Sequence, residues 1–196
     1  EQMAILVQRV SGSRHGRFFF PSLAGVAFSR NLYRWTDRID PRQGIVRLVF
    51  GLGTRAVNRV GSDYPRMIAI SHPLLRPEVG SKIVHYSQRQ VDVLDIERNE
   101  LRSMPLSEIL DEVAHPNLEF FVSTLQEGFV KDLVSGLIED TKGCVLTFNN
   151  LLARTDFVNY IKEALNRLEA AYGYPVDTEF TATLDASTGA VRLNFV

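Results

Sequence analysis

Short apolar runs separated by turn residues dominate the first half of the chain. The run Met3–Val10 is followed by Ser11-Gly12-Ser13, and the run Gly44–Phe50 is followed by Gly51-Leu52-Gly53. Short apolar runs bounded by glycine, serine and proline are typical of β-strands. The pattern therefore predicts a first half that is mostly sheet. The expected strands lie at residues 3–10, 25–29, 44–50, 65–71, 81–86 and 90–96.

The second half changes to helical spacing. Apolar residues recur every three or four positions over residues 118–129 and, more regularly, over residues 157–171. This spacing places them on one face of a helix. The second helix should begin after Thr155, a plausible N-cap, and end at Gly173. A further helix is expected to begin in the segment between Pro105 and Pro116.

The end of the chain has the pattern of a β-hairpin. Residues 176–184 alternate polar and apolar, residues 185–189 are turn-forming, and a second strand-like run covers residues 190–196. Two such runs around a short turn predict paired antiparallel strands. Together these patterns predict an α+β fold with a mixed or antiparallel sheet covered by packed helices.

Composition supports a globular protein. Apolar residues make up 45% of the chain and charged residues 23%, which excludes collagen-like, coiled-coil and largely disordered proteins. The single cysteine, Cys144, cannot form an internal disulfide. No targeting leader is apparent at the start, and no apolar run approaches the roughly 18 residues of a membrane span. We therefore expect a soluble, cytoplasmic protein.

The near-neutral net charge hides an asymmetry. Residues 1–60 contain ten arginines and no lysine against three acidic residues, whereas residues 97–196 contain eight basic and sixteen acidic residues. Arginine without lysine favours planar recognition of phosphate or carboxylate groups. The alternative is that the two halves simply lie against each other and neutralise one another.

Two carboxylates two positions apart are the first candidate for chemistry. In a strand, Asp177 and Glu179 point to the same face. Mg²⁺ in nucleotide sites is commonly held by one or two carboxylates together with phosphate oxygens and water. The alternative is an ordinary solvated strand face, which an isolated pair of this kind more often represents.

Other motifs are weaker. Gly51-Leu52-Gly53 could bring backbone amides close to a phosphate, although a plain turn explains the same residues. The chain lacks the further glycine of a dinucleotide fingerprint and the Gly-Lys-Ser/Thr ending of a P-loop. Its four histidines show no zinc-ligand spacing, and it has no Gly-x-Ser-x-Gly elbow.

Four segments in order resemble one known family. Val7–Val10 is similar to an adenine-side hinge strand, Gly25–Asn31 to a Gly-Val-x-Phe-Ser/Thr-x-Asn segment, Phe50–Gly53 to a Gly-Leu-Gly loop, and Tyr174–Phe180 to an Asp-x-Glu strand carrying a magnesium ligand. The family is the ATP-binding domain of phosphoenolpyruvate synthase and pyruvate phosphate dikinase, also called the PEP/pyruvate-binding domain, which has an ATP-grasp fold.

The resemblance covers about residues 1–70 and 155–196. It implies that residues 1–196 form the later, C-terminal part of one ATP-grasp nucleotide-binding domain, truncated at both ends, with a family-specific insertion at about residues 78–150. One departure concerns Thr54, which follows the Gly-Leu-Gly loop where the family commonly has Glu. An acidic group expected near the nucleotide is thereby replaced.

The resemblance implies part of an ATP-dependent phosphotransferase that binds Mg-ATP, inactive as an isolated chain. Its expected partners are ATP, possibly pyruvate, and other domains of the same full-length chain, with neither nucleic acid nor membrane. The alternative is a non-catalytic nucleotide- or ligand-binding regulatory module on the same scaffold, which Thr54 and the unmatched middle segment favour. The implied site residues are Gln8 and Val10 for adenine, Gly51 and Gly53 for the cofactor phosphates, Arg30 and Arg55 as catalytic groups facing phosphate, and Asp177 and Glu179 for Mg²⁺.

Overall fold

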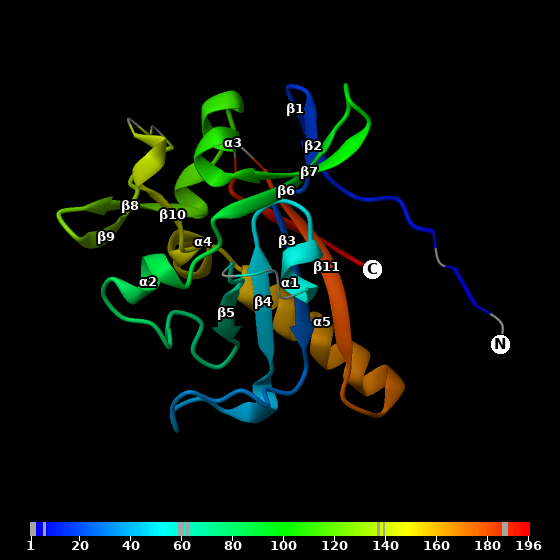
Figure 1. Ribbon diagram of the computed structural model, residues 1–196. Helices are drawn as coiled ribbons and strands as arrows, with labels where there is room; N and C mark the ends of the chain where they lie inside the picture. Colours follow the sequence, from blue (N-terminus) through cyan, green and yellow to red (C-terminus); the bar gives the residue numbers. More distant parts are fainter. Residues whose placement is uncertain are drawn as a thin grey trace.

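The computed structural model describes residues 3–5, 7–58, 61, 63–136, 138, 140–185 and 188–196 (Figure 1). It contains three sheets in which every strand pairing is antiparallel, together with a few helices. The α+β class expected from the sequence is confirmed.

The largest sheet joins the two ends of the chain. Its strand order is β12-β11-β3-β4-β5, so the C-terminal hairpin pairs with a strand from the first thirty residues. The hairpin expected at the end of the chain is confirmed, as are the expected strands near residues 25–29, 44–50 and 65–71. The strands are β3 (Leu23–Phe28), β4 (Ile45–Val49), β5 (Arg66–Ala69), β11 (Asp177–Leu184) and β12 (Val191–Phe195).

Two smaller sheets and several short helices complete the fold. The second sheet has the order β1-β2-β6-β7, with β1 (Ser13–His15), β2 (Phe18–Phe20), β6 (Gln90–Asp95) and β7 (Glu100–Pro105). The third has the order β10-β8-β9, with β8 (Val122–Gln126), β9 (Phe129–Asp132) and β10 (Cys144–Leu146). The short helices are α1 (Thr54–Val57), α2 (Lys82–His85), α3 (Leu106–Glu112) and α4 (Asn149–Arg154), and 3-10 turns occur at Pro41–Gln43, Leu118–Phe120 and Thr141–Gly143.

The longest helix, α5 (Phe157–Tyr172), covers one face of the largest sheet, as Figure 1 shows. Its Phe157, Ile161 and Leu165 are almost fully buried in the same core as Leu48 and Phe180 of the sheet. The Oγ1 atom of Thr155 accepts a hydrogen bond from the backbone N–H of Phe157, and Gly173 ends the helix with a φ of 76°. A left-handed residue at this position is the usual glycine stop. The predicted helix is confirmed. Among the described residues, none of the helices has the length and apolar character needed to cross a membrane.

The expected buried strand at residues 3–10 is wrong. The described residues of this segment have no regular secondary structure, and Met3 and Val7 are 85% and 87% exposed. Figure 1 shows the segment running away from the rest of the chain. A strand needs a neighbouring strand for its backbone groups, and the described part of the chain offers this segment none.

Two other predictions are also wrong. Residues 81–86 form the one-turn helix α2 instead of a strand, and residues 118–129 form mainly strands β8 and β9 instead of a helix. In the second case Glu127 and Gly128 both have positive φ values, 51° and 82°. Consecutive left-handed residues of this kind make a tight hairpin turn that matches the twist of the two strands. The turn thus overrides the helical spacing of the apolar residues.

Two histidines stack within the apolar core. The rings of His15 and His115 are 4.7 Å apart, and His115 also lies against Phe20, Phe50 and Phe121. The Nδ1 atom of His115 donates to the carbonyl of Pro116 at 2.7 Å, so the neutral ring carries no hydrogen on Nε2, which has no hydrogen-bond partner among the described residues. Burial, and next to it the charge of His15, lower the pKa of His115 to about 4.

This environment predicts acid sensitivity. The unfolded chain binds a proton on His115 as the pH falls through its ordinary pKa of 6.5, whereas the folded chain does so only near pH 4. Stability is therefore fully present above pH 6.5 and is lost as the pH falls towards 4, by about 2 kcal/mol between pH 7 and pH 5 from this group. The His115→Phe variant should lose that part of the pH dependence. Urea titrations of both proteins at the two pH values check this, and equal losses would contradict it.

Candidate functional site

The face of the largest sheet opposite α5 carries both predicted metal ligands. Glu179 lies beside Val26 on β3, which in turn lies beside Arg47 on β4. Asp177 is two residues from Glu179 on the same face, and both are exposed, whereas the intervening alternation places Phe180 in the core at 2% exposure. The expected placement of the two carboxylates on one strand face is confirmed.

A cavity of about 620 Å³ opens above this face. Four of the residues predicted from the sequence line it, namely Gln8, Val10, Gly53 and Glu179. They come from three distant parts of the chain, which the fold brings together: the N-terminal segment, the start of α1, and β11. The cavity is also lined by Arg9, Ser11, Ala24, Gly25, Leu52, Thr54, Val57, Asn58, Leu94, Phe180, Thr181, Asn194, Phe195 and Val196.

Small apolar side chains pack on this face of the sheet. Ala24, Val26 and Val49 of the sheet and Ala56 of α1 form a separate buried cluster, of which Ala24 lines the cavity. Together with Leu52 and Val57, Ala24 gives the cavity an apolar patch that suits a flat ring. The carboxylate of Glu179 adds a negative charge to the lining.

The two glycines of the Gly-Leu-Gly loop have different surroundings. Gly51 has a φ of 85°, and a Cβ there would lie 2.6 Å from Cγ1 of Val91 and 2.8 Å from the carbonyl oxygen of Asp92. The next residue, Leu52, donates its backbone N–H to that carbonyl at 2.9 Å. Gly51 thus fits the loop tightly against β6 and does not line the cavity, whereas Gly53 does.

Arg55 lies on the other side of α1 in a buried network. Its Nε atom is 2.9 Å from the carboxylate of Asp92, its Nη1 atom is 2.9 Å from that of Asp63, and its Nη2 atom donates to Ser103 at 2.8 Å. The hydroxyl of Thr54 also donates to the Asp92 carboxylate. The guanidinium is 8% exposed. These bonds connect α1 to β6 and hold α1, one wall of the cavity, in position.

The remaining predicted residues lie outside the cavity. Arg30 donates to the carbonyl of Arg42 and forms an ion pair with Glu169 of α5. Asp177 lines a different hollow of about 630 Å³, which Ala164, Arg167 and Leu168 of α5 also line. Of the eight predicted site residues, Gln8, Val10, Gly53 and Glu179 are therefore gathered in one place, and Asp177 is beside them on the sheet face.

Sequence reasoning missed Arg47, which lies on the same sheet face as the two carboxylates. Its guanidinium packs over the ring of Phe28 at 5.3 Å and lines a second cavity of about 640 Å³ on the Arg55 side of α1. The two cavities share Val57 and Asn58. The signal was available, because an arginine between Val46 and Leu48 indicates the open face of an otherwise buried strand.

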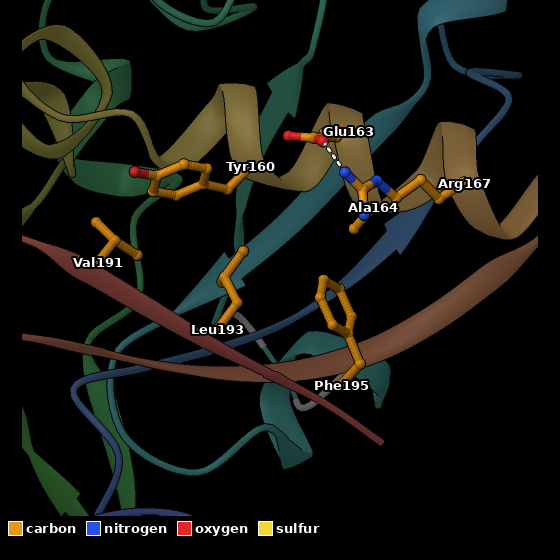
Figure 2. A pocket seen from close by; sticks show the side chains of 7 residues that line it. All are labelled: Tyr160, Glu163, Ala164, Arg167, Val191, Leu193 and Phe195. Atoms are coloured by element: carbon orange, nitrogen blue, oxygen red, sulfur yellow. Dashed lines mark hydrogen bonds and ion pairs between the residues drawn. The ribbon is translucent and has the colours of Figure 1, made fainter.

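A shallower hollow of about 390 Å³ lies on the α5 side of the sheet, between α5 and β12 (Figure 2). Tyr160 and the paired Glu163 and Arg167 face Leu193 and Phe195 across it. None of the predicted site residues lines this hollow, so it is distinct from the candidate site.

Pairing between the two halves explains little of the charge asymmetry. Among the described arginines of residues 1–60, Arg17 and Arg30 form ion pairs with acids beyond residue 97, namely Glu112 and Glu169. Arg47 has no acidic partner among the described residues. The basic first part is therefore not simply neutralised by the acidic second part.

Comparison with known proteins identifies the family. No curated protein matches the chain. The family described as the AMP/ATP-binding domain of pyruvate phosphate dikinase matches residues 1–193. The match includes the Gly-Leu-Gly loop and the strand of Asp177 and Glu179, and it extends through residues 78–150. The chain therefore belongs to the family of pyruvate phosphate dikinase AMP/ATP-binding domains.

Proposed function

We propose that the chain binds Mg-ATP in the 620 Å³ cavity and presents it for phosphoryl transfer in an enzyme related to pyruvate phosphate dikinase. The observation that carries this proposal is the convergence of Gln8, Val10, Gly53 and Glu179 on one cavity. The family resemblance assigns each of these residues to the nucleotide or to its metal, and the fold brings them together.

The N-terminal segment supplies the adenine side of the proposed site. Gln8 and Val10 line the cavity, and residues 7–10 form no backbone hydrogen bond within the described part of the chain. Their amide and carbonyl groups are therefore available to the polar edge of a base. The apolar part of the lining, with Ala24, Leu52 and Val57, would receive the flat face of the ring.

Asp177 and Glu179 are the proposed metal ligands. Neither carboxylate has a cationic partner among the described residues, and both are exposed on one face. This donor set fits Mg²⁺, which takes one or two carboxylates and completes its shell with phosphate oxygens and water. When bound, the cation neutralises negative charge on the phosphates during transfer.

Arginines would complete the phosphate side of the site. We propose Arg47 as the guanidinium that faces the phosphates, because it shares the sheet face with the two carboxylates and has no acidic partner in the described part of the chain. It lines the 640 Å³ cavity, which adjoins the 620 Å³ cavity at Val57 and Asn58, so the phosphates would have to extend past these two residues to reach it. The roles of Arg30 and Arg55 in facing phosphate remain predictions. In the structure both arginines form ion pairs with acidic residues. The bonds of Arg55 instead position α1 and the start of the cavity wall.

A binding-only module is the second candidate function. Thr54 stands where the family commonly has Glu, and its hydroxyl donates to the buried Asp92 instead of facing the cavity with a negative charge. A domain of this kind could bind nucleotide without transferring a phosphoryl group. The phosphotransferase and the binding module predict the same affinity for Mg-ATP and differ in turnover.

Binding is tested by calorimetry on the complete protein. We expect Glu179→Gln to weaken Mg-ATP binding by about tenfold or more, because a carboxylate ligand becomes a neutral amide. Asp177→Asn should show a similar but smaller effect. The control is Glu108→Gln, an exposed residue of α3 that lines none of the cavities described above, which should bind like the wild type. Equal affinities of wild type and Glu179→Gln would remove the metal role.

Turnover separates the two candidate functions. Mg-ATP and pyruvate are incubated with the complete protein, and the consumption of ATP is followed by chromatography. Consumption that disappears in Glu179→Gln supports phosphotransfer. Tight binding of Mg-ATP without consumption supports the binding module.

A further inference from the structure

A buried arginine lies on the core side of the largest sheet. Arg66 begins β5 and sits in the same row across the sheet as Leu48 and Phe180, which are 0% and 2% exposed. Its own exposure is 4%. The fold therefore places a guanidinium where the neighbouring strands place large apolar side chains.

This guanidinium has no partner. None of the three nitrogen atoms of the Arg66 head group forms a hydrogen bond, and no ion pair involves it, among the described residues. Arg55 is a useful contrast, since it is buried to a similar degree and its head group contacts two carboxylates and a hydroxyl. The difference is that no carboxylate or hydroxyl among the described residues accepts a hydrogen bond from the head group of Arg66.

A second cation lies close to Arg66. Burial, and next to it the positive charge of Arg76, lower the pKa of Arg66 to about 9. Arg76 is itself largely buried, and two of its nitrogen atoms, Nε and Nη1, have no hydrogen-bond partner in the described part of the chain. Two desolvated like charges repel each other, and a buried charge without a counter-ion is costly.

The nearby acids offset the charge of the two arginines only in part. Glu78 is 3.5 Å from Nε of Arg76, and its charge also acts on Arg66 without forming an ion pair or a hydrogen bond with it. Asp132 acts on Arg76 through its charge, but its Oδ1 atom already accepts hydrogen bonds from Ser123 and Asn149. The nitrogen atoms of Arg66 therefore have no acceptor among the described residues.

We propose that Arg66 and Arg76 form a binding site for a small oxyanion of the phosphate or carboxylate class. Guanidinium groups recognise both through paired N–H donors on planar forks, and such charge-assisted bonds are among the stronger ones in proteins. An oxyanion between the two heads would satisfy the free nitrogen atoms and remove the repulsion between the cations. This site is independent of the proposed nucleotide function, because Arg66 faces the side of the sheet opposite Asp177 and Glu179.

The chain neighbours of both arginines meet at the 640 Å³ cavity beside α1. Pro65 and Met67, which flank Arg66, line it, as do Pro77 and Glu78, which follow Arg76. This shared lining places the two segments close together, although neither guanidinium lines the cavity itself.

The test measures the midpoint of thermal unfolding of the complete protein in sodium phosphate, sodium acetate and sodium chloride at equal ionic strength. We expect phosphate to raise the midpoint of the wild type by about 4 °C for each tenfold increase above its dissociation constant. Arg66→Met, which keeps the length of the side chain without the charge, should show no such rise. The control Arg167→Met removes an exposed arginine of α5 and should respond like the wild type.

The measurement in sodium acetate shows which class of anion the site binds. A rise in acetate that also requires Arg66 supports a site for oxyanions in general, and a rise in phosphate alone narrows the site to phosphate. An equal rise in wild type and Arg66→Met, or no rise beyond that in chloride, overturns the proposal. If Arg66→Met does not fold, calorimetry with inorganic phosphate compares the wild type with Arg76→Gln. Binding about tenfold weaker in that variant is expected if both heads hold the anion, and unchanged binding overturns the proposal.

Discussion

Replacing Arg55 with methionine should lower the free energy of unfolding by about 3–5 kcal/mol, because it leaves buried carboxylates without their cation. The side chains of Asp63 and Asp92 are each 8% exposed, and Arg55 contacts both at 2.9 Å. Water cannot replace the lost partner at such burial without opening the structure. Urea denaturation followed by circular dichroism measures the loss.

The matched control for this change is Arg47→Met. Arg47 is only partly buried and has no acidic partner among the described residues, so its loss should cost less than about 1 kcal/mol of stability. The two variants remove the same charge from two side chains that line the same cavity. A loss for Arg55→Met no greater than that for Arg47→Met would show that the network contributes little to stability.

Gly51→Ala should destabilise the protein by about 2–5 kcal/mol, the sum of a strained backbone and a forced contact. Its φ of 85° is unfavourable for alanine, and the added Cβ would lie within 2.9 Å of Val91 and of the backbone of Asp92. Because Gly51 does not line the cavity, the effect should appear in unfolding and not as a selective loss of nucleotide affinity. Urea denaturation and nucleotide calorimetry on the same samples distinguish the two.

Gly53→Ala, two residues away, is the internal comparison. A Cβ there meets Cβ of Ala24 at 3.4 Å, an ordinary contact, and Gly53 has no positive φ. Its stability should therefore stay within about 0.5 kcal/mol of the wild type, while any effect on nucleotide binding reflects its place in the cavity lining. Equal destabilisation by the two substitutions would contradict this account of the loop.

The elements that the sequence predicts most closely have a long, regular pattern, although several short strands are also predicted correctly. Helix α5 has a continuous apolar stripe and a glycine stop, and the β11–β12 hairpin has strict alternation around a turn. The segments at residues 81–86 and 118–129 failed for another reason. Their short apolar runs fit helix or strand equally well, and the choice is made by the turn at Glu127 and Gly128 and by packing against distant segments.

The candidate site was predictable to a similar extent. The alternation of a strand was enough to place Asp177 and Glu179 on one face, and the family resemblance supplied Gln8, Val10 and Gly53. The partners of Arg55 could not be predicted, because Asp92 lies 37 positions away and meets it only in the folded chain. Asp92 lies within residues 78–150, the segment expected to be a family-specific insertion. The insertion itself remains a prediction.

The unequal anchoring of the cavity walls has a thermodynamic consequence. On one side, α1 is bonded to β6, and Gln88 holds the backbone of Phe50 before the loop with two hydrogen bonds of 2.8 and 2.9 Å. On the other side, residues 7–10 carry no backbone hydrogen bond within the described chain. One wall is already in place before a ligand binds. The protein would therefore lose conformational entropy on binding mainly by ordering the other wall. Restricting the backbone of that segment in its bound shape should therefore tighten binding without any new contact.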